Sequence, residues 1–140
     1  MSESLDRGFL VDSDVLLDIA SDDPAWAERS SGALADALRV GHVVVNPVVY
    51  AEVSVGFPTI DDVEAALPMA LFQRAPLPYR AAFLAGKALL AYRRREGQAR
   101  SPLPDFYIGA HAAVAGFTLI TRDARRYRTY FPTVPLVTPH

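Results

Sequence analysis

The stretch GFLVDSDVLLD, residues 8–18, decides how the N-terminal part of the chain is expected to fold. The apolar residues 9–11 predict a short buried strand, and residues 14–20 predict the helix that follows it. Asp12 stands directly after the strand, and further carboxylates follow at positions 14 and 18. Acidic side chains at the end of a core strand either cap a helix and face water, or hold something positively charged.

The composition indicates a folded globular protein and narrows its function classes. The chain has 140 residues, 51% hydrophobic and 21% charged, so we expect one domain over residues 1–140, with residues 1–8 as a polar N-terminal extension. The net charge of −2 argues against a protein that holds nucleic acid by bulk positive charge. No apolar run approaches the roughly 18 residues of a membrane span, so a cytoplasmic protein without membrane contact is expected.

The missing residue types restrict the metal chemistry that is possible. The absence of cysteine excludes disulfides, thiolate zinc sites and cysteine nucleophiles. The three histidines are scattered along the chain. A bound metal would therefore take mainly oxygen ligands, which favours magnesium, manganese or calcium.

Short β-branched runs alternate with longer helical segments along the chain. Pro24 can open a helix that stops at Gly41, and Asn46-Pro47 supplies an N-cap followed by a first-turn proline. The predicted strands are residues 9–11, 43–45, 118–120 and 134–137. The predicted helices are residues 14–20, 24–41, 48–55, 59–67, 78–96 and 101–115. This alternation predicts an α/β protein with a mostly parallel sheet covered by helices on both faces.

Acidic residues follow the predicted strands at the edge where such sheets form their sites, the carboxyl ends of the strands. Asp12 follows the first strand, and Asp123 follows the strand 118–120. Asp105 lies in the first turn of the helix that runs antiparallel to the strand 118–120, so its side chain is expected at the same edge. Glu52 is the only formal charge between positions 42 and 61, and helical spacing places it on an apolar stripe.

These placements allow four acids from separate segments to converge: Asp12, Glu52, Asp105 and Asp123. Convergent carboxylates repel and raise one another's pKa values. A divalent cation removes this conflict, and oxygen ligands suit magnesium or manganese. A metal held by a few acids with open water positions is a site for phosphoryl transfer or hydrolysis.

Each of these residues also has an ordinary structural explanation. Asp12 or Ser13 can cap a helix, Asp105 can interact with a helix dipole, Asp123 can start a turn, and Glu52 can pair with a buried arginine. The acids expected to be solvated are Asp18, Asp61 and Asp62.

Several neighbours of the four acids have two possible roles. Asp14 is either a weak or indirect ligand or a surface acid, and Thr121 either orients Asp123 or merely ends a strand. The arginines on either side of Asp123 either guide phosphate or form surface pairs: Arg122, Arg125, Arg126 and Arg128. The basic run at residues 92–95 either interacts with a helix dipole or contacts phosphate.

Four blocks in order carry a resemblance to a known family: FLVDSDVLLD, VNPVVYAEVSVG, LPDFYIGAHA and LITRDARRYRTYFPTV. Together they resemble PIN-domain ribonucleases, especially VapC-type toxins, over nearly the whole chain. The resemblance implies a three-layer α/β/α sandwich and Mg²⁺- or Mn²⁺-dependent cleavage of RNA. It also implies catalytic and metal-binding roles for Asp12, Glu52, Asp105 and Asp123, supported by Thr121, Ser13 and Asp14. Asp14 is a departure, because relatives often carry Asn or Ser there.

The resemblance further implies a toxin held inactive by a cognate VapB-type antitoxin, commonly as a homodimer. Phe57, Phe72 and Tyr79 are candidates for the antitoxin groove, with burial in the core as the alternative. Two rival functions remain at this stage. One is a non-catalytic PIN domain that binds RNA or a protein, and the other is a haloacid-dehalogenase-like phosphatase, which DSDVL superficially fits.

Overall fold

The computed structural model describes residues 7–96 and 102–140, and its five strands form a single parallel sheet. The strands are β1 (Arg7–Val11), β2 (Gly41–Val45), β3 (Phe72–Arg74), β4 (Thr118–Ile120) and β5 (Leu136–Val137). They lie in the order β3-β2-β1-β4-β5, and Leu10 of the central β1 pairs with Val44 on one side and Leu119 on the other. The carboxyl ends of β1, β2 and β4 therefore meet at one edge.

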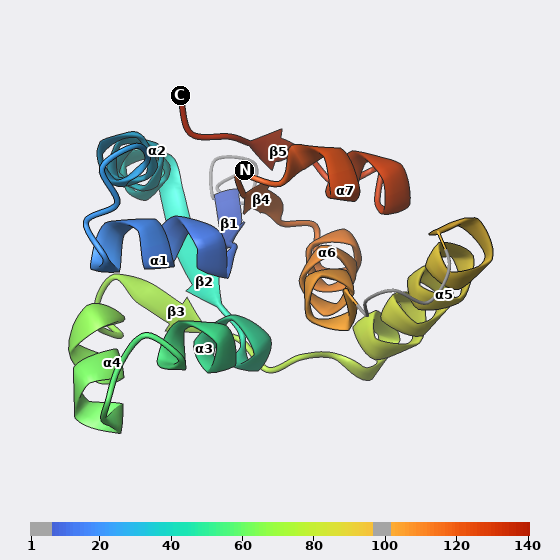
Figure 1. The fold of residues 1–140 in the computed structure, drawn as a ribbon, viewed down its shortest axis with the longest axis horizontal. Coiled ribbons are helices and arrows are strands. Elements are labelled where there is room, and N and C mark those ends of the chain that lie inside the picture. The colour runs from blue at the N-terminus through green and yellow to red at the C-terminus, as the bar shows by residue number, and fades with distance from the viewer. Residues whose placement is uncertain (1–6, 97–101) are drawn as a thin grey trace, which may run out of the picture.

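Helices flank this sheet (Figure 1). They are α1 (Ser13–Ala20), α2 (Ala27–Val40), α3 (Pro47–Ser54), α4 (Ile60–Ala66), α5 (Tyr79–Glu96), α6 (Leu103–Ala115) and α7 (Ala124–Tyr130). The long α5 lies at the periphery and packs on α6 (Figure 1). The predicted α/β sandwich with a mostly parallel sheet is confirmed.

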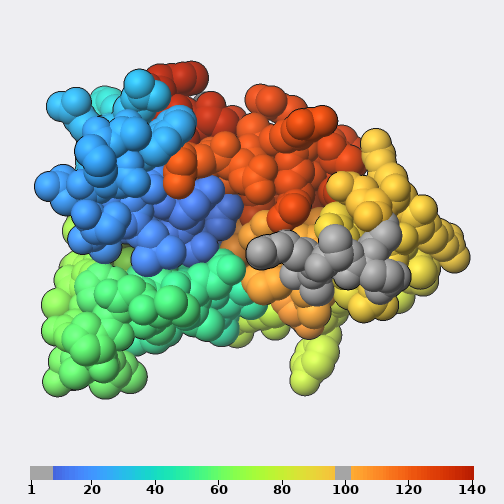
Figure 2. All heavy atoms as spheres, in the orientation of Figure 1, coloured from blue at the N-terminus to red at the C-terminus, as the bar shows by residue number. Residues whose placement is uncertain are grey.

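The two sides of the molecule come from different parts of the chain. Figure 2 shows α1 and α2 in blue and the α3–α4 region in green on one side, with α6 and α7 in orange to red on the other. The fully buried residues of the strands, among them Leu10, Val11 and Ile120, form the core between them. No helix in the described ranges is both long and apolar enough to cross a bilayer.

Local sequence explains where the helices near the sheet edge begin and end. The Asn46 side chain accepts a hydrogen bond of 2.9 Å from the backbone N–H of Val49 and so caps α3, which Pro47 opens as predicted. Gly116 ends α6 with a φ of 76°, a conformation that costs glycine little.

One helix start, one strand and two missed elements are the main differences from the sequence prediction. The helix expected from Pro24 begins at Ala27, because Asp23 Oδ1 accepts hydrogen bonds of 2.9 Å from the backbone of Ala25 and Trp26 and holds a turn there. The expected last strand, residues 134–137, is reduced to β5. The sequence did not predict β3 or α7.

Both missed elements are short. In β3 one buried residue is followed by two exposed ones, which is too little for a period of two to be recognised. The seven residues of α7 are rich in arginine, and its fully buried Tyr127 sits between charged neighbours. At Gly109 of α6, a Cβ would lie 2.5 Å from the ring of Phe131, so the absence of a side chain lets the end of α7 pack closely on α6.

Candidate metal centre

Asp12 stands at the centre of the carboxyl edge. Its backbone N–H donates to the carbonyl of Ile120 at 2.9 Å, which fixes the residue between β1 and β4. Its Oδ1 accepts from the backbone N–H of Ser13 at 2.8 Å, so Asp12 also caps α1. Its Oδ2 accepts from the hydroxyl of Thr121 at 2.7 Å and from that of Tyr127 at 3.1 Å. The side chain is almost fully buried.

This environment makes the charged form of Asp12 costly. Burial, with the nearby Asp14 as a second cause, raises the pKa of Asp12 from its ordinary 3.8 to about 8, although the hydrogen bonds from Thr121 and Tyr127 favour the charged form. A carboxyl group that is held by several donors but lacks a counter-charge suits a position that receives a cation.

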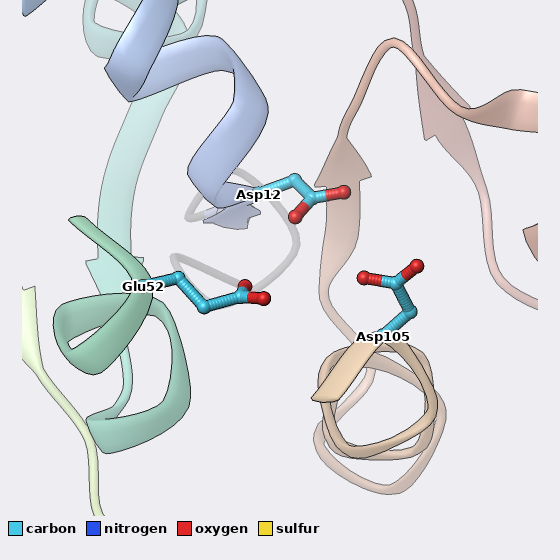
Figure 3. Close-up of side chains that lie close together, drawn as sticks. All are labelled: Asp12, Glu52 and Asp105. Atoms are coloured by element: carbon cyan, nitrogen blue, oxygen red, sulfur yellow. The ribbon is translucent and has the colours of Figure 1, made fainter. Parts of the chain in front are cut away.

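Two further carboxylates join Asp12 from other segments. Ligand oxygens of Asp12, Glu52 and Asp105 all lie within 4.8 Å of one another. Figure 3 shows the three side chains pointing toward one another from the end of β1, from α3 and from the first turn of α6. Burial raises the pKa of both Glu52 and Asp105.

The predicted apolar stripe around Glu52 explains its position. Val49 and Val53 of α3 are buried, whereas Glu52 is partly buried. Its Oε1 accepts a hydrogen bond of 2.8 Å from the hydroxyl of Ser13, which directs the carboxylate toward the start of α1. Among residues 7–96 and 102–140 no arginine pairs with Glu52, so the alternative of a buried arginine partner is not found there.

Asp14 lies near the three acids, and only one of its two carboxylate oxygens has a hydrogen-bond partner among the described residues. Its Oδ2 accepts from the backbone N–H of Arg122 at 3.2 Å, but its Oδ1 is buried with no hydrogen-bond partner among the described residues. Burial raises the pKa of Asp14 to about 6. An unpartnered buried oxygen is costly unless something donates to it or binds it.

The donor set fits a hard divalent cation. All the candidate ligands are carboxylate oxygens, and a shared ion with ligands at about 2.0–2.6 Å can bridge oxygens at the separations found. The unpartnered Oδ1 of Asp14 supplies a further acceptor at the same edge. The site thus offers several carboxylate oxygens to an ion that would balance their negative charge.

Asp123 lies outside this group of three. It is exposed at the start of α7, and its backbone N–H donates to the Thr121 hydroxyl at 3.0 Å, while the same hydroxyl donates to Asp12. Its charge raises the pKa of Asp105. The structure therefore brings together three of the four acids that the sequence singled out and places Asp123 at the rim.

The predicted arginine rim divides into different roles. Arg126 Nη1 donates to Asp105 Oδ2 at 2.6 Å, so this arginine lies against the acidic group itself. Arg125 is exposed on α7. The Arg122 side chain contacts Asp18 and Trp26 instead of the acidic group.

Asp18 is one of these partners, and the prediction that it is solvated was wrong. Asp18 is 4% exposed, and its carboxylate accepts from the Ser30 hydroxyl at 2.9 Å and pairs with Arg122 Nε at 2.9 Å. The guanidinium of Arg122 also lies 4.7 Å from the centre of the Trp26 ring. Asp18 faces α2 rather than water, because it lies on the side of α1 that packs there. The predicted exposure of Asp61 and Asp62 is confirmed.

Tyr127 is the residue at this site that sequence reasoning missed. It is fully buried, and its hydroxyl reaches Asp12. The signal that could have found it is the spacing of Tyr127, Tyr130 and Phe131, which marks one face of a short helix between the arginines.

Comparison with known proteins gives a family and a set of similar folds. The PIN domain family model matches residues 9–132. Among solved structures, a VapBC2 complex from Rickettsia felis bound to a promoter DNA fragment contains a chain that is 14% identical, with a TM-score of 0.70 over 95% of this chain and 99% of that one. No protein of curated function matches the sequence.

Two further solved structures contain chains whose fold is similar to that of this chain. A chain of a toxin–antitoxin complex from Klebsiella pneumoniae is 25% identical, with a TM-score of 0.64 over 94% of this chain and 97% of that one. A chain of VapBC-1 from nontypeable Haemophilus influenzae is 15% identical, with a TM-score of 0.68 over 94% and 97%.

Proposed function

The chain belongs to the PIN domain family, and from this we propose that it is a Mg²⁺- or Mn²⁺-dependent endoribonuclease, the toxin of a VapBC-type toxin–antitoxin pair. The observation that carries the proposal is the approach of Asp12, Glu52 and Asp105 to within 4.8 Å, from segments far apart in the sequence. Hydrolysis of a phosphodiester at a metal held by carboxylates is the chemistry that such a group suits.

In this proposal Asp12, Glu52 and Asp105 hold the ion directly, and Asp123 completes the site from the rim. The chemistry supplied by bound Mg²⁺ or Mn²⁺ is polarisation of the scissile phosphate and a lower pKa of water at the site. The other residues orient the ligands. Ser13 holds Glu52 by its hydroxyl, and Thr121 and Tyr127 hold Asp12.

The arginines around the acidic group have different proposed roles. Arg126, paired with Asp105, lies where it can meet the charge of a phosphate that enters the site. Arg125 is a phosphate contact at the rim. Arg122 is engaged by Asp18 and Trp26, so its main part is to position the loop between β4 and α7. Asp14, through its unpartnered Oδ1, is a further acceptor for the ion or its water.

The proposed partners are RNA as substrate, a VapB-type antitoxin and a second copy of the chain, in the cytoplasm. Support for the antitoxin comes from similar folds in VapBC and other toxin–antitoxin complexes. Of the aromatic residues considered for its groove, Phe72 belongs to the core, Phe57 is partly buried, and Tyr79 is 94% exposed. Tyr79 therefore remains the candidate for contact with a partner.

The rival functions are less well supported. A haloacid-dehalogenase-like phosphatase conflicts with the PIN family match. A non-catalytic PIN domain would have no need for three carboxylates within 4.8 Å of one another, because acids at this distance repel one another.

A cleavage assay tests the proposal. Purified protein is incubated with total RNA and Mn²⁺ or Mg²⁺, and compared with Asp12→Asn, Asp105→Asn and the control Asp61→Asn, which removes an exposed acid of α4. We expect cleavage by the wild type and the control, its loss in the other two variants, and its loss in EDTA. Equal cleavage by all four proteins would refute the nuclease site. Growth arrest on expression, relieved by co-expressing a neighbouring antitoxin gene, tests the toxin role.

A further inference from the structure

A polar cavity of about 520 Å³ lies beside the acidic group and is lined by residues from the C-terminal end of α5 and from α7. Its walls carry three arginines, Arg95, Arg125 and Arg126, together with the hydroxyl residues Thr129 and Tyr130. Arg95 comes from the basic run at the end of α5, and the others come from α7. The cavity therefore brings together the two basic segments of the sequence whose roles were left open.

The residues that line this cavity include three arginines and two acids, Glu96 and Asp123. Arg95 and Arg125 enter no ion pair with any residue of the described ranges. The acid that lies next to Arg95, Glu96, accepts a hydrogen bond of 2.6 Å from the Tyr130 hydroxyl. Two arginines that form no ion pair with any described residue thus line the cavity, although the chain as a whole has a net charge of −2.

Arg126 and Asp123 connect this cavity to the acidic group. Both line the cavity, and Arg126 is paired with Asp105 at 2.6 Å. Asp105 is in turn one of the three acids that meet around Asp12. An anion in the cavity would therefore lie next to a phosphate that occupied the metal site.

We infer that the cavity is a subsite for a backbone phosphate of the RNA strand, next to the phosphate that is cleaved, with Arg95 and Arg125 as its principal donors. The inference rests on the proposed function, because it takes RNA as the substrate. Guanidinium groups match phosphate oxygens with two parallel hydrogen bonds. Such contacts position a strand without reading its sequence, and they would let a chain of negative net charge bind RNA at one focused place.

RNA binding without a metal tests this subsite apart from catalysis. The anisotropy of a short fluorescein-labelled single-stranded RNA is measured in EDTA for the wild type, Arg95→Ala, Arg125→Ala and the double variant. The matched controls are Arg80→Ala on α5 and Arg128→Ala on α7, since each removes an exposed arginine from the same helix but outside the cavity.

We expect each cavity variant to weaken binding by roughly tenfold, as for the loss of a charge-assisted hydrogen bond. For single strands, each lost phosphate contact should also reduce the slope of log K against log salt by about 0.7. The controls should stay near the wild-type affinity and slope. Circular dichroism spectra of all the variants show whether the fold is retained.

Three results would overturn the inference. The first is equal affinity and slope for cavity and control variants, and the second is failure of the wild type to bind RNA. The third is displacement of the RNA by poly-glutamate as readily as by inorganic polyphosphate of the same total charge, which would make the cavity an acidic-peptide site. Cleavage with Mn²⁺, measured in parallel, reports on the proposed function. If the wild type cleaves RNA while all arginine variants bind RNA equally well, the nuclease function stands and the phosphate subsite is refuted.

Discussion

The hydroxyl of Tyr127 donates a hydrogen bond of 3.1 Å to Oδ2 of Asp12, across a separation of 115 residues in the sequence. Both side chains are buried. The contact ties α7 to the end of the central strand, and together with the Thr121 hydroxyl it fixes the orientation of the most buried acid of the site. The last helix is therefore part of the candidate metal centre rather than only a cover for the sheet.

Replacing Tyr127 with Phe should weaken metal binding while keeping the fold. The ring and its packing remain, but Asp12 loses one of the donors that favour its charged form. Loss of such an outer hydrogen bond typically reduces metal affinity by about 10–100-fold. Calorimetric titration with Mn²⁺ measures the change. Tyr130→Phe is the matched control, because it removes a hydroxyl–carboxylate bond from the same helix at Glu96; an equal loss in both variants would refute the role of Tyr127.

The stability of the metal-free protein should fall as the pH rises from about 4 to 8. Asp12 has a raised pKa of about 8 when folded and an ordinary value of 3.8 when unfolded, so the folded state binds the extra proton throughout this range. Stability is then greatest at the acidic end and decreases by up to about 1.4 kcal/mol per pH unit from this group.

Urea unfolding in EDTA, at several pH values, measures this dependence. Other carboxylates titrate too, so the informative quantity is the difference between the wild type and Asp12→Asn, whose side chain cannot ionise. We expect the variant to gain stability over the wild type as the pH rises. A difference that does not change between pH 4 and 8 would show that Asp12 carries no raised pKa.

Removing the carboxylate of Asp18 should destabilise the fold although this acid lies outside the group of three. Asp18→Ala leaves the Arg122 guanidinium and the Ser30 hydroxyl without their partner, at a cost of about 2–3 kcal/mol in the free energy of unfolding. Asp36→Ala breaks the exposed pair with Arg39 and should cost less than about 1 kcal/mol. Chemical denaturation compares the two; similar small losses would mean that the buried pair contributes little.

The sequence was sufficient to predict the sheet edge and three of the four acids expected to meet there, for identifiable reasons. The apolar run before Asp12, the N-cap at Asn46 and the glycine after Ala115 are local signals, and the structure has the strand end, the helix start and the helix end where they indicate. The isolated charge of Glu52 among valines indicated its inward position, which the structure has.

What escaped prediction depends on contacts between distant segments. Asp18 looks like a surface acid until α2 brings Ser30 to it and the loop after β4 brings Arg122. Tyr127 has no recognisable role until α7 folds back onto Asp12. Asp123 follows β4 as expected, but the short loop between β4 and α7 leaves it exposed at the rim, with Thr121 and not Asp123 hydrogen-bonded to Asp12.

The most direct test of the metal centre is a crystal structure of the protein soaked in Mn²⁺, with anomalous scattering measured to locate the ion. The account predicts an anomalous peak between the carboxylates of Asp12, Glu52 and Asp105, and none there in a crystal of Asp12→Asn. A wild-type crystal that binds Mn²⁺ only elsewhere, or leaves these three carboxylates without an ion at saturating Mn²⁺, would contradict it.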